Sequence, residues 1–281
     1  LMPVVVRNVI GRMDRREFLA TASALGAPVG TAVRDETNAG IYQEYEGGLI
    51  TWSAKTGARV VLWPFSTQWL TQGGAAGLGW ATADTVKITE AGGGMYQSFS
   101  QGMLTKASGK STFTLNADTG AGYRKLGGPT GPLGWTTQAA TTSAAGTPMQ
   151  RFENGTLFAA GGKAGYVPAS LLSTYVGMRD AAGVLGFPTG NYTESSVNCG
   201  GGFHPFEKGT IFASSEHGVH PVFGWMQTGH NKYKGLEGIG WPVGDRAMDA
   251  VVSKFAQTFE GGTIFTDGKN YALMTDTFLE K

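Results

Sequence analysis

The 281 residues are enough for one or two domains, and 41% of them are hydrophobic, which suffices for a buried core. Lys and Arg number 22 against 21 Asp and Glu, which excludes a broad charged surface for nucleic acid or anionic lipid and favours a neutral, polar partner. No segment reaches the roughly 20 consecutive apolar residues of a membrane-spanning helix, so we expect no membrane insertion, while 45 glycines predict many tight turns.

The N-terminal segment has two interpretations. From Met13 it reads MDRREFLATASALGAPVG, and paired arginines followed by small and apolar residues are typical of a twin-arginine export signal. The same segment also aligns with RVVLWPFSTQWLTQGGAAGLGWAT at 59–82, as a strand, a short helix and a Leu-Gly turn. We favour the second interpretation, which places Arg15 and Arg16 on the exposed face of the helix and makes Leu25-Gly26 part of a first repeat.

Two short phrases recur along the chain with the same period. The first is Leu or Ile followed by glycine, and its glycines, spaced 52 to 55 residues apart, are Gly26, Gly79, Gly134, Gly186 and Gly240. The second is an aromatic residue with glycine three positions later, and its aromatics, spaced 53 or 54 apart, are Tyr45, Phe99, Phe152, Phe206 and Phe259. Two independent phrases with one period predict five tandem repeats of about 54 residues.

Each repeat is predicted to contain a β-meander of three short strands. In the first repeat, Gly47-Gly48 separates IYQEYE from LITWS, and Thr56-Gly57 precedes RVVLW. In the third, the turn Asn154-Gly155 separates MQRFE from TLFAA. In the last, Gly261-Gly262 separates FAQTFE from TIFT, and NYALM follows.

The connectors between meanders predict one short helix each. Examples are STQWLTQGGAAG at 66–77 and SLLSTYVGMRDAAG at 170–183, in which glycine ends the helix. The sequence therefore predicts a mainly β chain whose repeats span 1–52, 53–106, 107–159, 160–213 and 214–281, the last with a C-terminal cap strand. Because the strands at the two ends are supplied separately, we expect an elongated stalk of stacked repeats, with a closed five-membered ring as the alternative.

Leu185-Gly186-Phe187-Pro188 resembles the motif that names the LGFP repeat, and related phrases stand in the other repeats. Three depart from the motif, with Ala27 in place of the aromatic residue and with Ala81 and Thr136 in place of proline. The resemblance implies retention on the arabinogalactan and peptidoglycan wall of mycolic-acid bacteria, where such repeats accompany mycoloyltransferases or peptidoglycan hydrolases. It therefore implies a secreted module of the cell envelope, which we expect to be monomeric.

The sequence gives no sign of a catalytic centre. It contains no Gly-x-Ser-x-Gly elbow, so we expect any mycoloyltransferase domain to lie outside these residues. The glycine-rich phrases GLGWATAD and GIGWPVGD lack the spacing and the long following helix of a phosphate-binding loop. We expect no enzyme activity and no cofactor.

Histidine and cysteine give only a weak metal signal. The phrase EHGVH at 216–220 could supply two ligands, but the sequence places no Cys, third His or carboxylate at a convincing spacing from it. We interpret the phrase as a hairpin turn and expect no metal. Cys199, the one cysteine, is interpreted as a loop residue and can form no disulfide within the chain.

The aromatic residues of the Leu-Gly phrase are the candidate ligand contacts, namely Trp80, Trp135, Phe187 and Trp241. Sugar rings stack on indole faces, and the indole N–H can donate a hydrogen bond. The alternative is that each ring fills a small core or wedges between neighbouring repeats. The aromatics of the second phrase, from Tyr45 to Phe259, are expected to be core residues.

Two functional hypotheses follow from the repeats. In the first, the chain is a non-catalytic wall-binding module, because several weak sites on a repeating polymer can raise avidity about 10² to 10⁴ fold. In the second, it is a structural stalk that presents a catalytic domain or a partner protein and has no affinity for sugar.

Overall fold

The computed structural model describes residues 25–35, 39–250 and 254–275. These residues belong to two compact bodies, the first running to residue 140 with 150–153 added, the second comprising 141–149 and 154 onward. Within the described residues, no helix has the length and apolar character needed to cross a membrane. The twin-arginine segment before Leu25 lies outside the described residues, so its interpretation stays a prediction.

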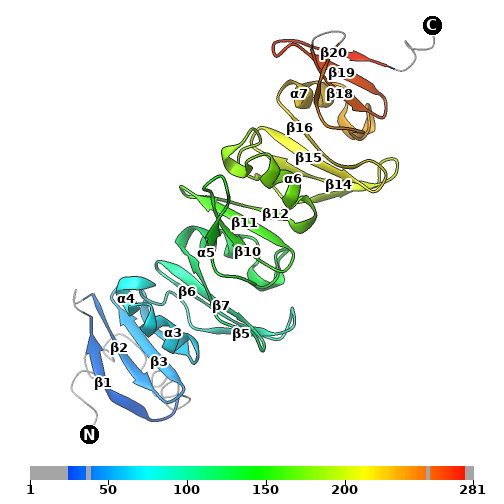
Figure 1. Cartoon of the computed structure of the whole chain (residues 1–281). Coiled ribbons are helices and arrows are strands. Elements are labelled where there is room, and N and C mark those ends of the chain that lie inside the picture. The colour runs from blue at the N-terminus through cyan, green and yellow to red at the C-terminus, as the bar shows by residue number, and fades with distance from the viewer. Residues whose placement is uncertain (1–24, 36–38, 251–253, 276–281) are drawn as a thin grey trace. The chain divides into compact units, whose positions relative to one another are not determined.

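The described residues form five antiparallel sheets of four strands each, and in each sheet the strands lie in chain order (Figure 1). The first sheet consists of β1 (Pro28–Arg34), β2 (Gly40–Tyr45), β3 (Gly48–Ser53) and β4 (Gly57–Leu62). The second consists of β5 (Val86–Ile88), β6 (Gly94–Phe99), β7 (Gly102–Ala107) and β8 (Phe113–Asn116). The third consists of β9 (Thr141–Thr142), β10 (Pro148–Arg151), β11 (Gly155–Ala160) and β12 (Lys163–Pro168).

The last two sheets repeat this arrangement. The fourth consists of β13 (Thr193–Ser195), β14 (Gly201–Phe206), β15 (Gly209–Ser214) and β16 (Gly218–Phe223). The fifth consists of β17 (Ala247–Asp249), β18 (Lys254–Phe259), β19 (Gly262–Thr266) and β20 (Tyr271–Met274). The prediction of a mainly β chain built from repeats is confirmed, and the strands fall where the two phrases place them. The choice between stalk and ring and the exact repeat boundaries stay predictions.

One strand of each sheet differs from the expected three-stranded meander. An additional strand precedes the meander, and in four of the five sheets it is only two or three residues long. So short a strand has no alternating apolar pattern for a sequence to display. It forms by backbone pairing to the edge of the meander, as Thr193 to Phe203 shows in the fourth sheet.

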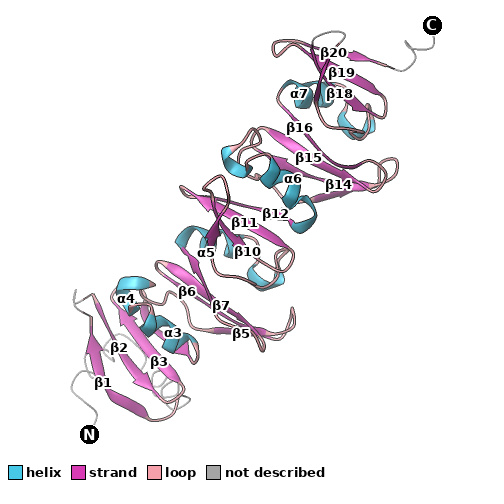
Figure 2. Ribbon diagram, in the orientation of Figure 1, coloured by secondary structure: helices cyan, strands magenta, loops and turns pink. Residues whose placement is uncertain are grey.

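Short helices follow the sheets, as predicted (Figure 2). They are α3 (Phe65–Thr71), α4 (Gly74–Gly77), α5 (Ala117–Lys125), α6 (Leu172–Gly177) and α7 (Trp225–Lys232), with 3₁₀ turns η1 (Gly128–Thr130), η2 (Ala169–Leu171), η3 (Asp180–Ala182) and η4 (Gly235–Glu237). The longest, α5, is capped at its N-terminus by Asn116, whose side chain accepts the Thr119 N–H at 2.9 Å. Arg124 and Lys125 in its last turn complement the helix dipole.

Adjacent apolar residues of a central strand pack into cores on opposite faces of the sheet. In the first body, Leu49 of β3 packs with Val61 and with Trp69 of α3. The next residue, Ile50, points to the opposite face and packs against Leu25. Each fully buried Leu or Ile stabilises the fold by about 1.5 to 3 kcal/mol, so a sheet needs a cover on both sides.

The second body follows the same rule. In β15, Ile211 belongs to a core with Tyr175 and Leu185, whereas the adjacent Phe212 belongs to a core with Met226 and Trp241. Within each body, a helix together with the Leu-Gly phrase after it therefore packs against the sheets as a separate layer. We call each such layer a junction.

Candidate functional site

The glycine of the Leu-Gly phrase makes a turn that other residues would strain. In all five repeats this glycine has a positive φ between 69° and 85°. In addition, a Cβ placed on Gly186 would lie 2.5 Å from Oε2 of Glu207. The tight turns predicted from the glycines are thus confirmed at these positions.

Each described junction uses a ring on its helix to hold the carbonyl of this glycine. The four donors and acceptors are Trp69 Nε1 to Gly79 O at 2.8 Å, Tyr123 Oη to Gly134 O at 2.7 Å, Tyr175 Oη to Gly186 O at 2.9 Å and His230 Nε2 to Gly240 O at 3.2 Å. All four rings are buried. Burial raises the pKa of both tyrosines and lowers the pKa of His230, so each ring stays neutral and donates one hydrogen.

A glutamate side chain accepts a hydrogen bond from the backbone N–H of the residue after the same glycine. Its Oε2 accepts this N–H in four repeats: Glu46 from Ala27, Glu153 from Trp135, Glu207 from Phe187 and Glu260 from Trp241, at 2.9 to 3.1 Å. The second repeat has Ser100 in this position. These residues were not predicted, although a glutamate stands directly after the aromatic of the second phrase in four repeats.

Trp135 and Trp241 are buried within their junctions. Only 2% of Trp135 and none of Trp241 is exposed. Their indole N–H groups donate to the carbonyls of Ala91, at 2.8 Å, and Val197, at 2.9 Å. For these two residues the geometry favours the alternative in which the ring fills a core.

Phe187 is more accessible. Its ring is partly buried, and the ammonium group of Lys163 lies 5.9 Å from its centroid. The same Lys163 pairs with Oε1 of Glu207 at 2.6 Å. The ion pair between Lys163 and Glu207 therefore lies beside the ring of Phe187.

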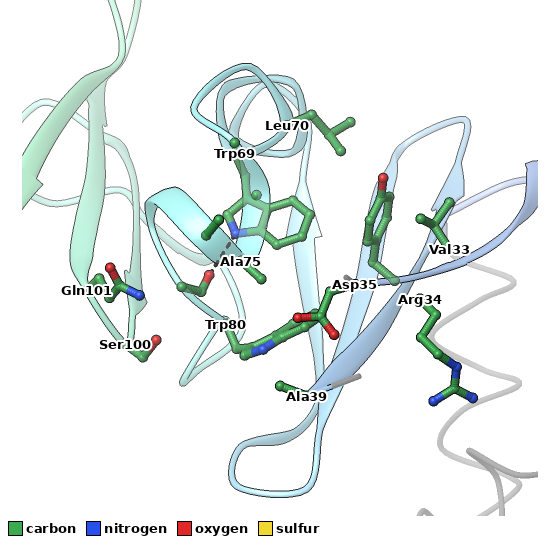
Figure 3. Close-up of a pocket in the computed structure, with 15 residues that line it drawn as sticks. Val33, Arg34, Asp35, Ala39, Trp69, Leu70, Ala75, Trp80, Ser100 and Gln101 are labelled. Atoms are coloured by element: carbon green, nitrogen blue, oxygen red, sulfur yellow. Dashed lines mark hydrogen bonds between the residues drawn. The ribbon is translucent and has the colours of Figure 1, made fainter. Parts of the chain in front are cut away.

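Trp80 lines a cavity of 670 Å³ in the first body (Figure 3). The ring of Trp69 lies 6.0 Å from that of Trp80, and Tyr42 meets Trp69 edge-on at 5.2 Å. The three rings line the same cavity, from α3, from β2 and from the residue after Gly79. Trp80 is 9% exposed, the largest value among the three candidate tryptophans.

Polar side chains complete this cavity. Arg34 and Asp35 come from the end of β1, and Ser100 and Gln101 from the turn between β6 and β7 (Figure 3). Oδ1 of Asp35 accepts the N–H of Gly40 at 3.0 Å, which orients the carboxylate.

Tyr42, which lines the cavity, also carries a hydroxyl group. Its pKa is raised by burial and then by the charge of Glu44, so the hydroxyl keeps its proton and can donate. Aromatic faces beside mixed donors and acceptors suit a ligand rich in hydroxyl groups.

The four predicted aromatic residues are divided between the two bodies. Trp80 and Trp135 belong to the first body, and Phe187 and Trp241 to the second. Only Trp80 lines the described cavity, and its neighbours Tyr42, Arg34 and Asp35 were not predicted. They come from the preceding sheet, so their proximity depends on packing that the phrase itself does not encode. A ligand-binding role for the four aromatics stays a prediction.

The chain is a mainly β repeat protein, because four-stranded sheets recur along it and the same pattern of hydrogen bonds recurs at the junctions. The pattern of the LGFP repeat family matches residues 25–77 and 185–237, which together are less than half of the chain. Each match begins at a Leu-Gly phrase and runs through a meander and its helix. These two segments are similar to LGFP repeats, a cell-wall-associated family that is not catalytic, and the similarity suggests a binding or structural module.

Other comparisons add little. No curated protein matches the sequence. Among solved structures, a streptogramin B lyase is 9% identical over 88% of this chain and 68% of its own, with a TM-score of 0.18. Virginiamycin B lyase from Staphylococcus aureus is 8% identical over 89% and 70%, with a TM-score of 0.16. The extracellular domain of a hybrid two component system from B. thetaiotaomicron is 10% identical over 87% and 27%, also at 0.16. Such low scores carry no argument about fold or function.

Proposed function

We propose that the chain is a non-catalytic module that anchors a secreted envelope protein to the arabinogalactan and peptidoglycan polymer through repeated weak sites. The proposal draws on the LGFP repeats at 25–77 and 185–237 and on the cavity at Trp80. The anchored protein would be a mycoloyltransferase or a peptidoglycan hydrolase, and the module itself would act as a monomer in the cell wall.

The chemistry of the Trp80 cavity is the observation that carries the proposal. Sugars present both C–H faces, which pack on aromatic rings, and hydroxyl groups, which need donors and acceptors side by side. Trp80 and Tyr42 supply the rings, while Arg34 and Asp35 supply a donor fork and a carboxylate acceptor. With 22 basic and 21 acidic residues, the chain has no broad field that would select a highly charged polymer instead.

Weak binding at one such site is sufficient for wall retention. A dissociation constant near 1 mM corresponds to about 4 kcal/mol, and a second site on the same polymer acts at a high effective concentration. A polymer that repeats its epitope therefore suits a protein that repeats its fold. Catalysis would instead need different groups in different roles, whereas the repeated hydrogen bonds at the junctions serve the same structural role each time.

Co-sedimentation with purified, mycolate-free arabinogalactan-peptidoglycan tests the proposal. We expect saturable binding of the full chain, with separate arms for arabinogalactan and for peptidoglycan to identify the polymer. A double variant, Arg34→Ala with Gln101→Ala, removes polar groups of the cavity whose side chains are exposed, and it should weaken binding at least about tenfold.

The matched control is Arg151→Ala with Gln138→Ala. It changes the same two residue types at exposed positions outside the cavity lining. The control should bind as the unchanged chain does. Absence of sedimentation, or equal binding by both double variants, would remove the support that the cavity gives to the proposal.

The burial of Trp135 and Trp241 favours a second candidate, the structural stalk. In that case these rings only stabilise junctions, and the chain presents a catalytic domain or a partner protein. The stalk hypothesis predicts that Trp135→Ala lowers the unfolding temperature, and that no part of the chain sediments with wall polymer. The wall-binding proposal predicts that a folded Trp135→Ala variant still sediments through the Trp80 cavity.

A further inference from the structure

Two hairpin turns of the fourth sheet lie side by side. The first, between β13 and β14, contains Cys199, and the second, between β15 and β16, contains Glu216 and His217. The turn at EHGVH is therefore confirmed. Because β14 and β15 pair in register from Gly201 with Ser214, the turn that enters β14 and the turn that leaves β15 meet at one end of the sheet.

This pairing brings together three side chains with different donor atoms. Sγ of Cys199, a carboxylate oxygen of Glu216 and a ring nitrogen of His217 all lie within 4.8 Å of one another. Around a tetrahedral zinc ion, ligand atoms of these types are roughly 3.3 to 3.8 Å apart. Glu216 is exposed, so its side chain has room to rotate towards the other two donors. Spacing along the sequence concealed the cluster, because Cys199 and His217 meet only through strand register.

A carboxylate outside the cluster orients the imidazole of His217. Nε2 of this ring lies 3.1 Å from Oε1 of Glu260. The backbone N–H of His217 donates to Oγ of Ser214 at 3.0 Å. Histidines that bind metals commonly give their second ring N–H to a carboxylate, which fixes the tautomer. A proton on Nε2 leaves the lone pair of Nδ1 for a metal ion.

Glu260 is itself held in place. It accepts the N–H of Trp241 at 3.0 Å and the side-chain amide of Asn198, which stands next to Cys199 in the first turn. The groups that surround the cluster are thus tied to the hydrogen bonds of the junction.

The second histidine of the phrase is occupied elsewhere. Nδ1 of His220 lies 2.8 Å from Oδ1 of Asp245, and its Nε2 lies 2.7 Å from the carbonyl of His217. Both ring nitrogens therefore have partners, and His220 does not belong to the cluster. It provides a control at three residues' distance from His217.

The corresponding turns of the other sheets contain neither cysteine nor histidine. In the first sheet, Ser53 and Thr56 close the turn between β3 and β4 by a hydrogen bond of 2.7 Å. In the fifth sheet, the carboxylate of Asp267 accepts the N–H groups of Lys269 and Asn270 at 2.8 and 2.7 Å. A hairpin turn of this fold needs neither thiol nor imidazole, so their presence in the fourth sheet calls for another explanation.

We propose that Cys199, Glu216 and His217 bind a divalent cation of the zinc class, with Glu260 as the positioning residue and water as the remaining ligand. Thiolate, imidazole and carboxylate together match the preference of Zn²⁺ and disfavour Mg²⁺ or Ca²⁺, which take oxygen ligands. Binding replaces the proton of the Cys199 thiol by the metal and releases that proton to solvent. This proposal does not depend on wall binding.

Calorimetric titration of the chelator-treated full chain with zinc sulfate, under reducing conditions, tests the site. We expect one equivalent to bind and to raise the unfolding temperature. Cys199→Ser and His217→Gln should each lower the affinity at least about tenfold, whereas His220→Gln should leave it within about twofold. Titration with Co²⁺ should produce thiolate-to-cobalt absorption that is absent in Cys199→Ser.

The positioning role of Glu260 has its own readout. Glu260→Gln should lower zinc affinity by about 10 to 100 fold and retain the thiolate-to-cobalt absorption, because the ligands themselves remain. Circular dichroism should confirm that all variants stay folded. The proposal is overturned if the unchanged chain takes up no zinc, or if His217→Gln and His220→Gln affect binding equally.

Discussion

The junction between the first and second sheets and the junction between the fourth and fifth use one scaffold for different environments. In both, a helix ring donates to the carbonyl of the Leu-Gly or Ile-Gly turn, through Trp69 in one and His230 in the other. In both, a tryptophan follows the glycine. Trp80 lines a cavity of 670 Å³, whereas Trp241 is fully buried and donates its N–H to Val197. We call them the open junction and the closed junction.

The comparison distinguishes the structural role of the repeated Leu-Gly phrase from the role of the side chains that surround it. The phrase supplies the turn and a large ring in both junctions. The polar groups around the ring differ. Arg34 and Asp35 line the cavity of the open junction, while in the closed junction Glu260 accepts the N–H that follows the turn. We call this glutamate contact the clamp. The turn and its ring are therefore common to both junctions, whereas the described cavity lies at the open junction.

The largest contrast is expected from truncating the two tryptophans. Trp241→Ala should destabilise the chain by about 3 to 5 kcal/mol, because it leaves a void and an unpaired carbonyl. Trp80→Ala should cost less, about 2 kcal/mol, because its ring already borders a cavity that water can fill. Urea unfolding of both variants measures this difference, and equal losses would contradict the distinction between open and closed junctions.

Acid should act on the second body through its buried histidines. All four histidines lie between residues 204 and 230, and burial lowers the pKa of His204 to about 4 and that of His230 below its ordinary value. A depressed pKa favours the neutral ring in the fold. The resulting stability is complete above the unfolded pKa near 6.5 and is lost as the pH falls towards 4.

For His204 this loss amounts to about 3 kcal/mol at most. The ring packs edge-on against Tyr166 and Phe206, so His204→Phe keeps the contacts and removes the titration. Urea midpoints at pH 7 and pH 4.5 should differ less in this variant than in the unchanged chain. A midpoint difference of the same size in both proteins would assign the acid sensitivity to other groups.

The sequence predicted those features of the fold that recur within a repeat. Tight turns, strand positions and short helices each leave a local signal, such as the glycines at Gly79 and Gly186 that require a positive φ. The short first strand leaves none, since two or three paired residues display no periodicity. Contacts between repeats also depend on register, which explains why Tyr42 beside Trp69 and Cys199 beside His217 were not foreseen.

Removal of a single glutamate clamp should have a smaller effect. In Glu207→Ala the N–H of Phe187 loses its acceptor at 3.1 Å, and Lys163 loses its partner. Because these groups are partly exposed, we expect a loss of about 1 kcal/mol in the free energy of unfolding. Glu194→Ala, an exposed glutamate of β13, serves as the control and should change stability by less than about 0.5 kcal/mol. Equal effects would show that the clamp contributes nothing specific.

The smallest expected effect comes from giving the open junction the clamp that the closed one has. Ser100 occupies the position of Glu260 and lines the Trp80 cavity, so Ser100→Glu places a carboxylate within reach of the N–H that follows Gly79. A new charge-assisted hydrogen bond at this partly exposed turn should add about 0.5 to 1 kcal/mol to the free energy of unfolding. The same carboxylate narrows the cavity, so sedimentation with wall polymer should fall. A variant that is more stable and binds less wall polymer would show that this one residue decides between an open and a closed junction. Unchanged stability would mean that the open junction lacks the geometry for the clamp.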